Sequence, residues 1–244
     1  MLELESVCKS YGGRIVIRNL SLTIRDGTIT FLIGPNGAGK TTLFKLITGT
    51  ESLDSGSICF LGNRIDNELP HVRRRLGLSH AFQTPSSIPE LTVQSHLELA
   101  SGISFRALPS MLRAKYPKSL HLVIHRLLSN LGLEKMDSLR PSDLSHGQLK
   151  LLEIATSIVR CPQVLLLDEP TAGLTRKEGL VVADLVRRLK EHSAIIIIEH
   201  DMEFVREIGE HVVVLHEGNV FRSGSYEELR ADVTMREIYF GILE

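Results

Sequence analysis

The sequence predicts an α/β fold with a buried parallel sheet. Residues 29–33 form an apolar run, a glycine-rich loop follows, and residues 43–47 continue with helical spacing. That order of strand, glycine loop and helix is typical of a phosphate-binding loop. Two further runs, 164–167 and 194–198, are apolar throughout, which is typical of strands buried on both faces. The three runs together indicate a doubly wound sheet with a site at the carboxyl ends of its strands.

The glycine-rich loop contains the residue types that bind phosphate. Gly37 and Gly39 carry no Cβ, so backbone N–H groups can curl around an anion, and the following helix adds its positive end. Lys40 brings a full charge to the β- and γ-phosphates, and the Thr41 hydroxyl is placed to ligate Mg²⁺. The predicted nucleotide-binding loop comprises Gly34, Pro35, Asn36, Gly37, Ala38, Gly39, Lys40, Thr41 and Thr42.

Composition and charge argue against several classes of protein. The chain has 244 residues and a net charge of −1, so its charge does not indicate nucleic acid. Cys8, Cys59 and Cys161 lie far apart without metal-ligand or redox spacing, which predicts a reduced cytosolic protein with buried thiols. The longest apolar stretches are far shorter than the roughly 20 residues that span a bilayer. Any membrane role therefore needs partner subunits.

The remaining elements follow from hydrophobic spacing and turn residues. Residues 2–7 and 16–24 alternate as strands, and strands before a phosphate loop suggest an antiparallel layer beside the nucleotide. Residues 91–134 are mostly helical. We also expect a helix from the N-cap Ser145 through Arg160, a helix over 180–190, a hairpin over 212–222, and a solvated helix face at Arg73, Arg74 and Arg75.

Polar residues follow two of the buried strands. Asp168 and Glu169 come at the end of the run 164–167, and His200 comes shortly after the run 194–198. Such residues are often structural when they occur alone. Because the carboxyl ends of parallel strands meet at one edge of a sheet, we expect these three to lie beside the phosphate loop.

These features occur in one order along the chain: Tyr11, the loop 34–42, Gln83, the helix start Leu144-Ser145-His146-Gly147-Gln148, Asp168-Glu169 and His200. The whole chain resembles the nucleotide-binding subunit of ABC transporters, and the signature-like helix start is its most specific feature. The resemblance implies a P-loop NTPase (RecA-like) core with an antiparallel β subdomain and a helical signature subdomain. It implies a single domain over 1–244, with the core and β subdomain in 1–82 and 161–244 and the helical subdomain in about 83–160.

The resemblance also assigns roles around ATP and Mg²⁺. Tyr11 would stack on the adenine ring, and the loop amides and Lys40 would bind the phosphates. Thr41, Asp168 and Gln83 would hold Mg²⁺ directly or through water. Glu169 would be the general base, with His200 contacting the γ-phosphate and holding the base and the attacking water in place. Gln83 would couple the γ-phosphate to a membrane partner. Such parts suit phosphoryl transfer, in which positioning and charge neutralisation do most of the catalysis.

The signature-like residues Ser145, His146, Gly147 and Gln148 would act on a second subunit. Ser145 and Gly147 would contact the γ-phosphate of ATP bound to that subunit, so a head-to-tail pair would make two sites. Two positions depart from the usual family pattern. His146 stands where glycine is usual, as is familiar in carriers for branched-chain amino acids and urea, and Thr175 stands where aspartate is more usual.

Three segments resemble the ATPase subunits of branched-chain amino acid and urea importers, with the urea type closest. They are Phe82–Pro85, Leu144–Gln148 and Glu199–Val205, and the ending Ile238–Gly241 is also similar. The resemblance implies transmembrane permease subunits, a second ATPase subunit of the same or another kind, and an extracytoplasmic solute-binding protein. It places the chain at the cytoplasmic face of the cell membrane as a peripheral subunit.

The residues argue against three functions other than an import ATPase. Soluble ABC-type ATPases of DNA repair carry long heptad insertions, and those of translation carry two ATPase domains joined by a linker. Neither arrangement fits a chain of 244 residues. A regulatory module that binds nucleotide without hydrolysis would be favoured if Glu169 or His200 were missing, and both residues are present. A small-molecule kinase with a phosphate loop gives no reason for the helix start at Leu144–Gln148.

Overall fold

The computed structural model describes residues 2–81, 87–102 and 118–235. Its first sheet is antiparallel and has the strand order β2-β1-β4-β5. The alternation predicted for residues 2–7 holds from Leu2 to Glu5 and breaks at Ser6, whose φ is 49°. The register shifts there, so Val7 faces the same core as Leu2 and Leu4 although it lies three residues after Leu4. The strands are β1 (Leu2–Tyr11), β2 (Arg14–Ile24), β4 (Ser55–Phe60) and β5 (Asn63–Arg64).

The second sheet has six strands in the order β10-β9-β3-β8-β7-β6. The five strands from β9 to β6 are parallel, and β10 pairs antiparallel with β9 as the predicted hairpin. Non-consecutive neighbours in this order require crossovers, which the helices supply. The strands are β3 (Ile29–Ile33), β6 (Leu78–Ala81), β7 (Val164–Asp168), β8 (Ala194–Ile198), β9 (His211–His216) and β10 (Asn219–Gly224).

The central strands bury both faces, because their side chains alternate between two hydrophobic clusters. On β7, Leu165 and Leu167 belong to one cluster, and Val164 and Leu166 belong to the other. Helix α1 (Lys40–Thr48) contributes Leu43, Phe44, Leu46 and Ile47 to the cluster that also contains residues of the antiparallel sheet. Helix α1 therefore lies between the two sheets, which brings the β1–β2 hairpin close to the start of that helix.

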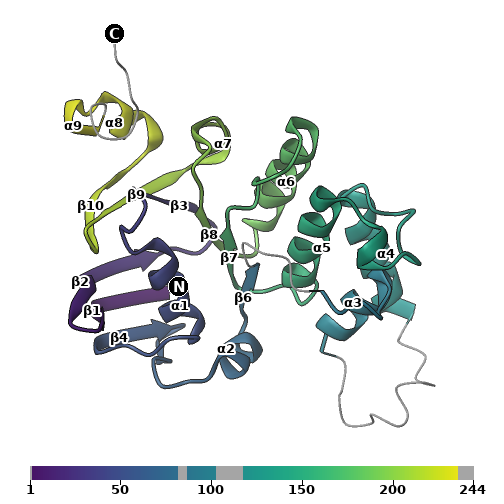
Figure 1. Cartoon of the computed structure of the whole chain (residues 1–244), viewed down its shortest axis with the longest axis horizontal. Helices are drawn as coiled ribbons and strands as arrows, with labels where there is room; N and C mark the ends of the chain where they lie inside the picture. The colour runs from purple at the N-terminus through teal and green to yellow at the C-terminus, as the bar shows by residue number, and fades with distance from the viewer. Residues whose placement is uncertain (1, 82–86, 103–117, 236–244) are drawn as a thin grey trace.

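The other face of the parallel sheet is covered by helices. Residues of α5 (His146–Ile158), α6 (Arg176–Leu189) and α7 (Met202–Ile208) share one cluster with the sheet. Figure 1 shows α3 (Val93–Ala100), α4 (Lys118–Asn130) and α5 gathered beyond β6, on the opposite side of the molecule from β1, β2 and β4. The short elements are α2 (Pro70–Leu76), the 3₁₀ turn η2 (Pro141–Asp143), α8 (Tyr226–Ala231) and α9 (Val233–Met235).

The predicted α/β class is confirmed, but two predictions about side chains are wrong. Arg73 is not part of a solvated face: it is 1% exposed and its guanidinium donates to the carbonyls of Leu46 and Ile47 at 2.6 and 2.8 Å. Those carbonyls lie in the last turn of α1, where a cation is favourable. The predicted buried thiols are also wrong, because Cys161 is exposed and Cys8 and Cys59 are only partly buried.

No helix in the described part of the chain is both long enough and apolar enough to cross a bilayer.

Candidate active site

The loop between β3 and α1 folds back on the lysine that begins the helix. Lys40 is buried, and its Nζ donates to the carbonyl oxygens of Gly34 at 2.6 Å and Pro35 at 3.1 Å. Burial lowers the pKa of Lys40, while the nearby carboxylates of Glu169 and Asp168 oppose that shift. The ammonium group of Lys40 is thus held against the backbone of the loop, with the carboxylates of Glu169 and Asp168 nearby.

Gly39 must be glycine for two reasons. Its φ is 104°, in the left-handed region, and a Cβ there would lie 2.6 Å from Ile17 Cδ1 and 3.1 Å from the carbonyl oxygen of Val16. A side chain would therefore separate strand β2 from the loop, besides straining the backbone. The same closeness makes the β1–β2 hairpin a wall of the site.

The carboxyl ends of β7 and β8 bring the predicted acidic and histidine residues together. Asp168 is the last residue of β7 and is buried, and burial raises its pKa, with the charge of Glu169 adding to the effect. Glu169 has φ at 48°, and its backbone N–H donates to Ile198 O at 2.9 Å. His200 Nε2 lies 3.2 Å from Glu169 Oε1. A strained backbone at a side chain so placed is a common property of functional sites.

Two adjoining cavities lie over the loop. The smaller, of about 300 Å³, is lined by Lys40, Thr41, Glu169 and His200 among others. The larger, of about 900 Å³, is lined by Tyr11 together with Arg14, Arg18 and His216. Both cavities have Val16, Asn36 and Gly37 among their lining residues, so the two lie next to each other over the loop.

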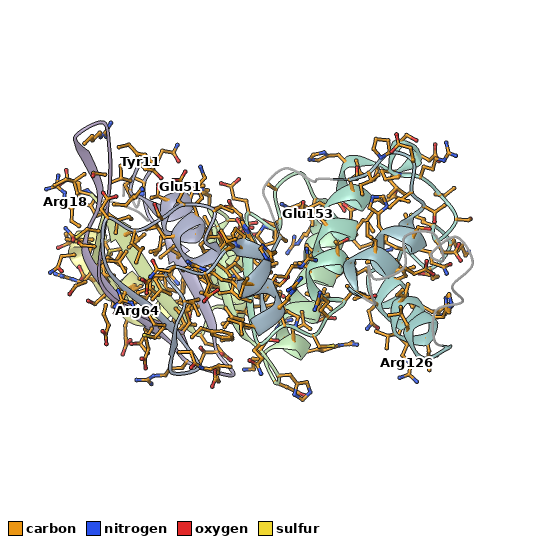
Figure 2. The ribbon with its side chains drawn as sticks, turned by 90° about the horizontal axis from the view of Figure 1, so that it is seen from below. Tyr11, Arg18, Glu51, Arg64, Arg126 and Glu153 are labelled. Atoms are coloured by element: carbon orange, nitrogen blue, oxygen red, sulfur yellow. The ribbon has the colours of Figure 1, made fainter. Side chains whose placement is uncertain are left out.

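Tyr11 lies at the turn of the β1–β2 hairpin, as predicted. The residue is 41% exposed, and Lys9 Nζ lies 5.3 Å from its ring centroid. Figure 2 shows Tyr11 and Arg18 at one end of the molecule, with Arg126 of α4 toward the other end and Glu153 of α5 between them. An aromatic face at the rim of the larger cavity suits stacking against a planar base.

The signature-like segment forms the start of α5. Ser145 is the N-cap: its Oγ accepts from Gln148 N at 3.2 Å, and Gln148 Oε1 accepts from Ser145 N at 2.8 Å. This reciprocal pair is a capping box, which fixes the backbone of the first turn. None of the described residues that line the two cavities belongs to 145–148.

The two departures from the usual family pattern have clear local partners. A Cβ on Gly173, whose φ is 76°, would lie 2.8 Å from His146 Cδ2, so the imidazole packs directly on that glycine. Thr175 is the N-cap of α6, and its Oγ1 donates to Glu178 Oε2 at 2.7 Å while its backbone N–H donates to the same oxygen at 2.8 Å. Threonine and aspartate both cap helices, so the substitution keeps the helix start.

Lys150 is a buried cation that sequence reasoning did not single out. It lies on α5, is 1% exposed, and donates from Nζ to the backbone carbonyl of Asp168 at 3.2 Å. Burial lowers its pKa, while the carboxylates of Glu153, Asp168 and others raise it. Helix α5 is therefore tied to the end of β7. The sequence could have indicated Lys150, because it lies on the same helix within one turn of Gly147 and Gln148.

Glu199 is the second residue that the sequence analysis did not assign. It directly follows β8, is 3% exposed, and accepts hydrogen bonds from Thr171 and from the backbone N–H groups of His200 and Asp201. A carboxylate directly after a fully apolar strand is the pattern that had already pointed to Asp168. Gln83 lies outside the described residues.

Comparison with known proteins agrees with this geometry. A family model described as ABC transporter matches residues 17–172. The chain belongs to the ABC transporter family. It is accordingly an ATP-binding ATPase, and the family resemblance, the fold and the enzyme class expected from the sequence are confirmed.

Two curated relatives cover nearly the whole chain. The high-affinity branched-chain amino acid transport ATP-binding protein LivG of Salmonella typhimurium is 32% identical, over 99% of this chain and 98% of its own. The lipopolysaccharide export system ATP-binding protein LptB of Acidithiobacillus ferridurans is also 32% identical, over 99% of this chain and 97% of its own.

Solved structures agree with the fold. A nucleotide-free ATP-binding cassette from an ABC transporter superposes with a TM-score of 0.84 at 28% identity, over 98% of each chain. A dimeric bacterial ABC transporter cassette superposes with a TM-score of 0.81 at 25% identity, over 92% of this chain and 98% of its own. The chain is therefore the ATPase subunit of a transporter.

Proposed function

We propose that this ATPase energises the uptake of a small polar solute, with branched-chain amino acids as the first candidate. This choice of solute is supported most directly by the similarity to the Salmonella typhimurium protein, which extends over nearly the whole chain. The name of that protein assigns it to branched-chain amino acid transport. Urea or a short amide stays within the proposal on the resemblance of the segments around Gln83, Ser145 and His200.

In the proposed site, ATP lies along the two adjoining cavities. Tyr11 stacks on the adenine ring at the rim of the larger cavity, and the loop 34–42 and Lys40 bind the phosphates in the smaller one. On binding, Lys40 exchanges the loop carbonyls of Gly34 and Pro35 for phosphate oxygens. This exchange keeps the ammonium group hydrogen-bonded in both states, which limits the cost of its burial.

The residues present fit Mg²⁺, which prefers hard oxygen ligands. Thr41 lines the smaller cavity. Burial and, after it, the charge of Glu169 raise the pKa of the Asp168 carboxyl, and a divalent cation would compensate both effects. We propose Thr41, Asp168 and Gln83 as the residues that hold the ion directly or through water. The ion would neutralise charge on the phosphate oxygens.

We propose Glu169 as the general base for the attacking water and His200 as the residue that orients it. The contact between His200 Nε2 and Glu169 Oε1 holds the two side chains over the same cavity as Lys40. The lysine and the helix N-terminus stabilise negative charge on the transferred phosphoryl group. In this mechanism water attacks the γ-phosphorus directly and ADP leaves, so positioned charges assist the reaction and no covalent intermediate with the protein forms.

The site of one chain is proposed to be completed by a second chain. Among the described residues, none of Ser145, His146, Gly147 and Gln148 lines the two cavities over the loop 34–42 of its own chain. A capped helix start offers backbone N–H groups to an anion. We propose that Ser145 and Gly147 contact the γ-phosphate of ATP held by the partner in a head-to-tail dimer. A related cassette is described as dimeric, which supports the arrangement.

The partners and the place of action are part of the same proposal. We propose that the chain binds transmembrane permease subunits at the cytoplasmic face of the membrane, through Gln83 and the segment 85–110. We propose also that an extracytoplasmic solute-binding protein serves the complex. We retain as a proposal the division into core and β subdomain (1–82 and 161–244) and helical subdomain (about 83–160).

Export is the second candidate, because the lipopolysaccharide export ATP-binding protein is as similar in identity and coverage as the import protein. The two candidates are separated by isolating the complex with its membrane subunits and reconstituting it in vesicles. Import of leucine with solute-stimulated ATP hydrolysis would support the proposal, and urea-stimulated hydrolysis would assign the solute to the urea type. Stimulation by lipopolysaccharide alone would support export and overturn the proposed direction.

A further inference from the structure

We infer that Glu199 is a positioning residue for ATP hydrolysis, which joins the loop of His200 to the loop that follows Glu169. The inference rests on the function proposed above for those two residues. Glu199 is only 3% exposed, and burying a carboxylate without hydrogen-bond or charge partners is costly.

The two oxygens of Glu199 serve different loops. Oε1 accepts from Thr171 N at 3.0 Å and from Thr171 Oγ1. Oε2 accepts from His200 N at 2.9 Å and from Asp201 N at 3.3 Å. Four donors on one carboxylate compensate its burial, and hydrogen bonds to a charged acceptor are stronger than neutral ones.

These bonds determine the geometry of the pair that performs the reaction. Thr171 lies two residues after Glu169, and His200 is the residue next to Glu199. The backbone on both sides of the 3.2 Å contact between His200 Nε2 and Glu169 Oε1 is therefore held by one carboxylate. Since the exposed imidazole has no other described hydrogen bond, its position depends on the backbone that presents it.

Only a carboxylate of this length satisfies both loops. Glutamine has one acceptor oxygen and a donor NH₂ group, so it would direct N–H toward N–H on one of the two sides. Aspartate keeps the charge but is one methylene shorter, so it cannot reach Thr171 from the same backbone. Either change should release one loop while leaving the phosphate-binding residues in place.

The test compares Glu199→Gln with the exposed Glu191→Gln as a matched control that removes the same charge. The turnover number for ATP hydrolysis by the full chain should fall for Glu199→Gln by on the order of tenfold to a hundredfold, the range expected when reacting groups are displaced slightly. The dissociation constant for ATP should stay within about twofold of wild type, because no phosphate contact is removed. Glu191→Gln should match wild type in both measurements.

Two further variants keep the inference testable. Thr171→Val removes one donor from the same carboxylate with a side chain of similar shape, and should lower turnover less than Glu199→Gln and in the same direction. In a His200→Ala background, Glu199→Gln should lower turnover no further, because the residue acts through His200.

The outcomes separate this inference from the function proposed above. If His200→Ala hydrolyses ATP normally, the proposed site is wrong. If His200→Ala is impaired while Glu199→Gln and Thr171→Val turn over as wild type, only the positioning role is overturned. A loss of ATP affinity equal to the loss of turnover in Glu199→Gln would indicate a general structural role and would also overturn it.

Discussion

His80 should make the fold sensitive to acid, because it is a histidine kept neutral by its surroundings. The residue lies on β6, both of its ring nitrogens are shielded from solvent, and its ring packs edge-on against Phe44 at 5.6 Å between centroids. Burial, together with the positive charge of Lys150, lowers the pKa of His80 to about 4 from 6.5. Between pH 6.5 and about pH 4, the unfolded chain therefore binds a proton at His80 that the folded chain does not bind.

The sign and size follow from that difference. The stabilising contribution is fully present above the unfolded pKa and is lost as the pH falls toward the folded pKa. A gap of roughly 2.5 pKa units corresponds to about 3 kcal/mol of unfolding free energy lost between pH 6.5 and 4. This figure is an upper bound, since His80 as a whole residue is only partly buried.

The assay is urea unfolding followed by circular dichroism at a series of pH values, comparing wild type with His80→Gln. Other groups also titrate, so the quantity of interest is the difference in unfolding free energy between the two proteins. The unfolding free energy of wild type should fall more steeply with decreasing pH than that of His80→Gln, because the variant has no side chain at position 80 that takes up a proton. The exposed His192→Gln is the control and should leave the acid loss unchanged. Parallel pH curves for wild type and His80→Gln would refute the argument.

Three further predictions concern the site and its support. Lys40→Ala should lose most of its affinity for ATP, measured by titration calorimetry, and unchanged affinity would contradict the placement of the phosphates. Glu169→Gln should bind ATP with Mg²⁺ normally, nearly stop hydrolysis and accumulate as an ATP-bound dimer on size-exclusion chromatography; normal turnover would remove it as the base. Arg73→Met should lower the unfolding free energy by roughly 3 kcal/mol, because it leaves several buried carbonyls without their charged donor, and a melting temperature equal to wild type would show that the carbonyls are otherwise satisfied.

The parallel sheet could be predicted because its strands are buried on both faces. A run such as Ala194–Ile198 has no polar residue, and neither a surface helix nor an edge strand tolerates that pattern. The loop was equally predictable, since its chemistry is local in sequence: Lys40 and Thr41 follow the glycines directly. The caps at Ser145 and Thr175 also depend on residues only three positions away.

What could not be predicted depends on contacts between distant segments. Arg73 belongs to three successive arginines, a pattern typical of a solvated helix face, and its burial follows from the end of α1 lying beneath it, 26 and 27 residues earlier in the chain. The partner of Glu199 is Thr171, 28 residues before it. Neither separation has a periodicity that a sequence pattern can show.

The central claim is that the catalytic site is shared between two chains, and complementation in a mixture tests it most directly. One variant, His200→Ala, damages the half that contains Lys40, and the other, Ser145→Arg, damages the half that contains the signature-like residues. Each alone should hydrolyse ATP slowly, because every site in either homodimer has one damaged half.

The measurement is the ATPase rate of the two variants mixed in equal amounts. Random pairing makes half of the dimers mixed, and each mixed dimer has one intact site, so the rate should recover to roughly a quarter of wild type. A mixture no faster than its separate components, or Ser145→Arg hydrolysing ATP at the wild-type rate by itself, would contradict the shared site.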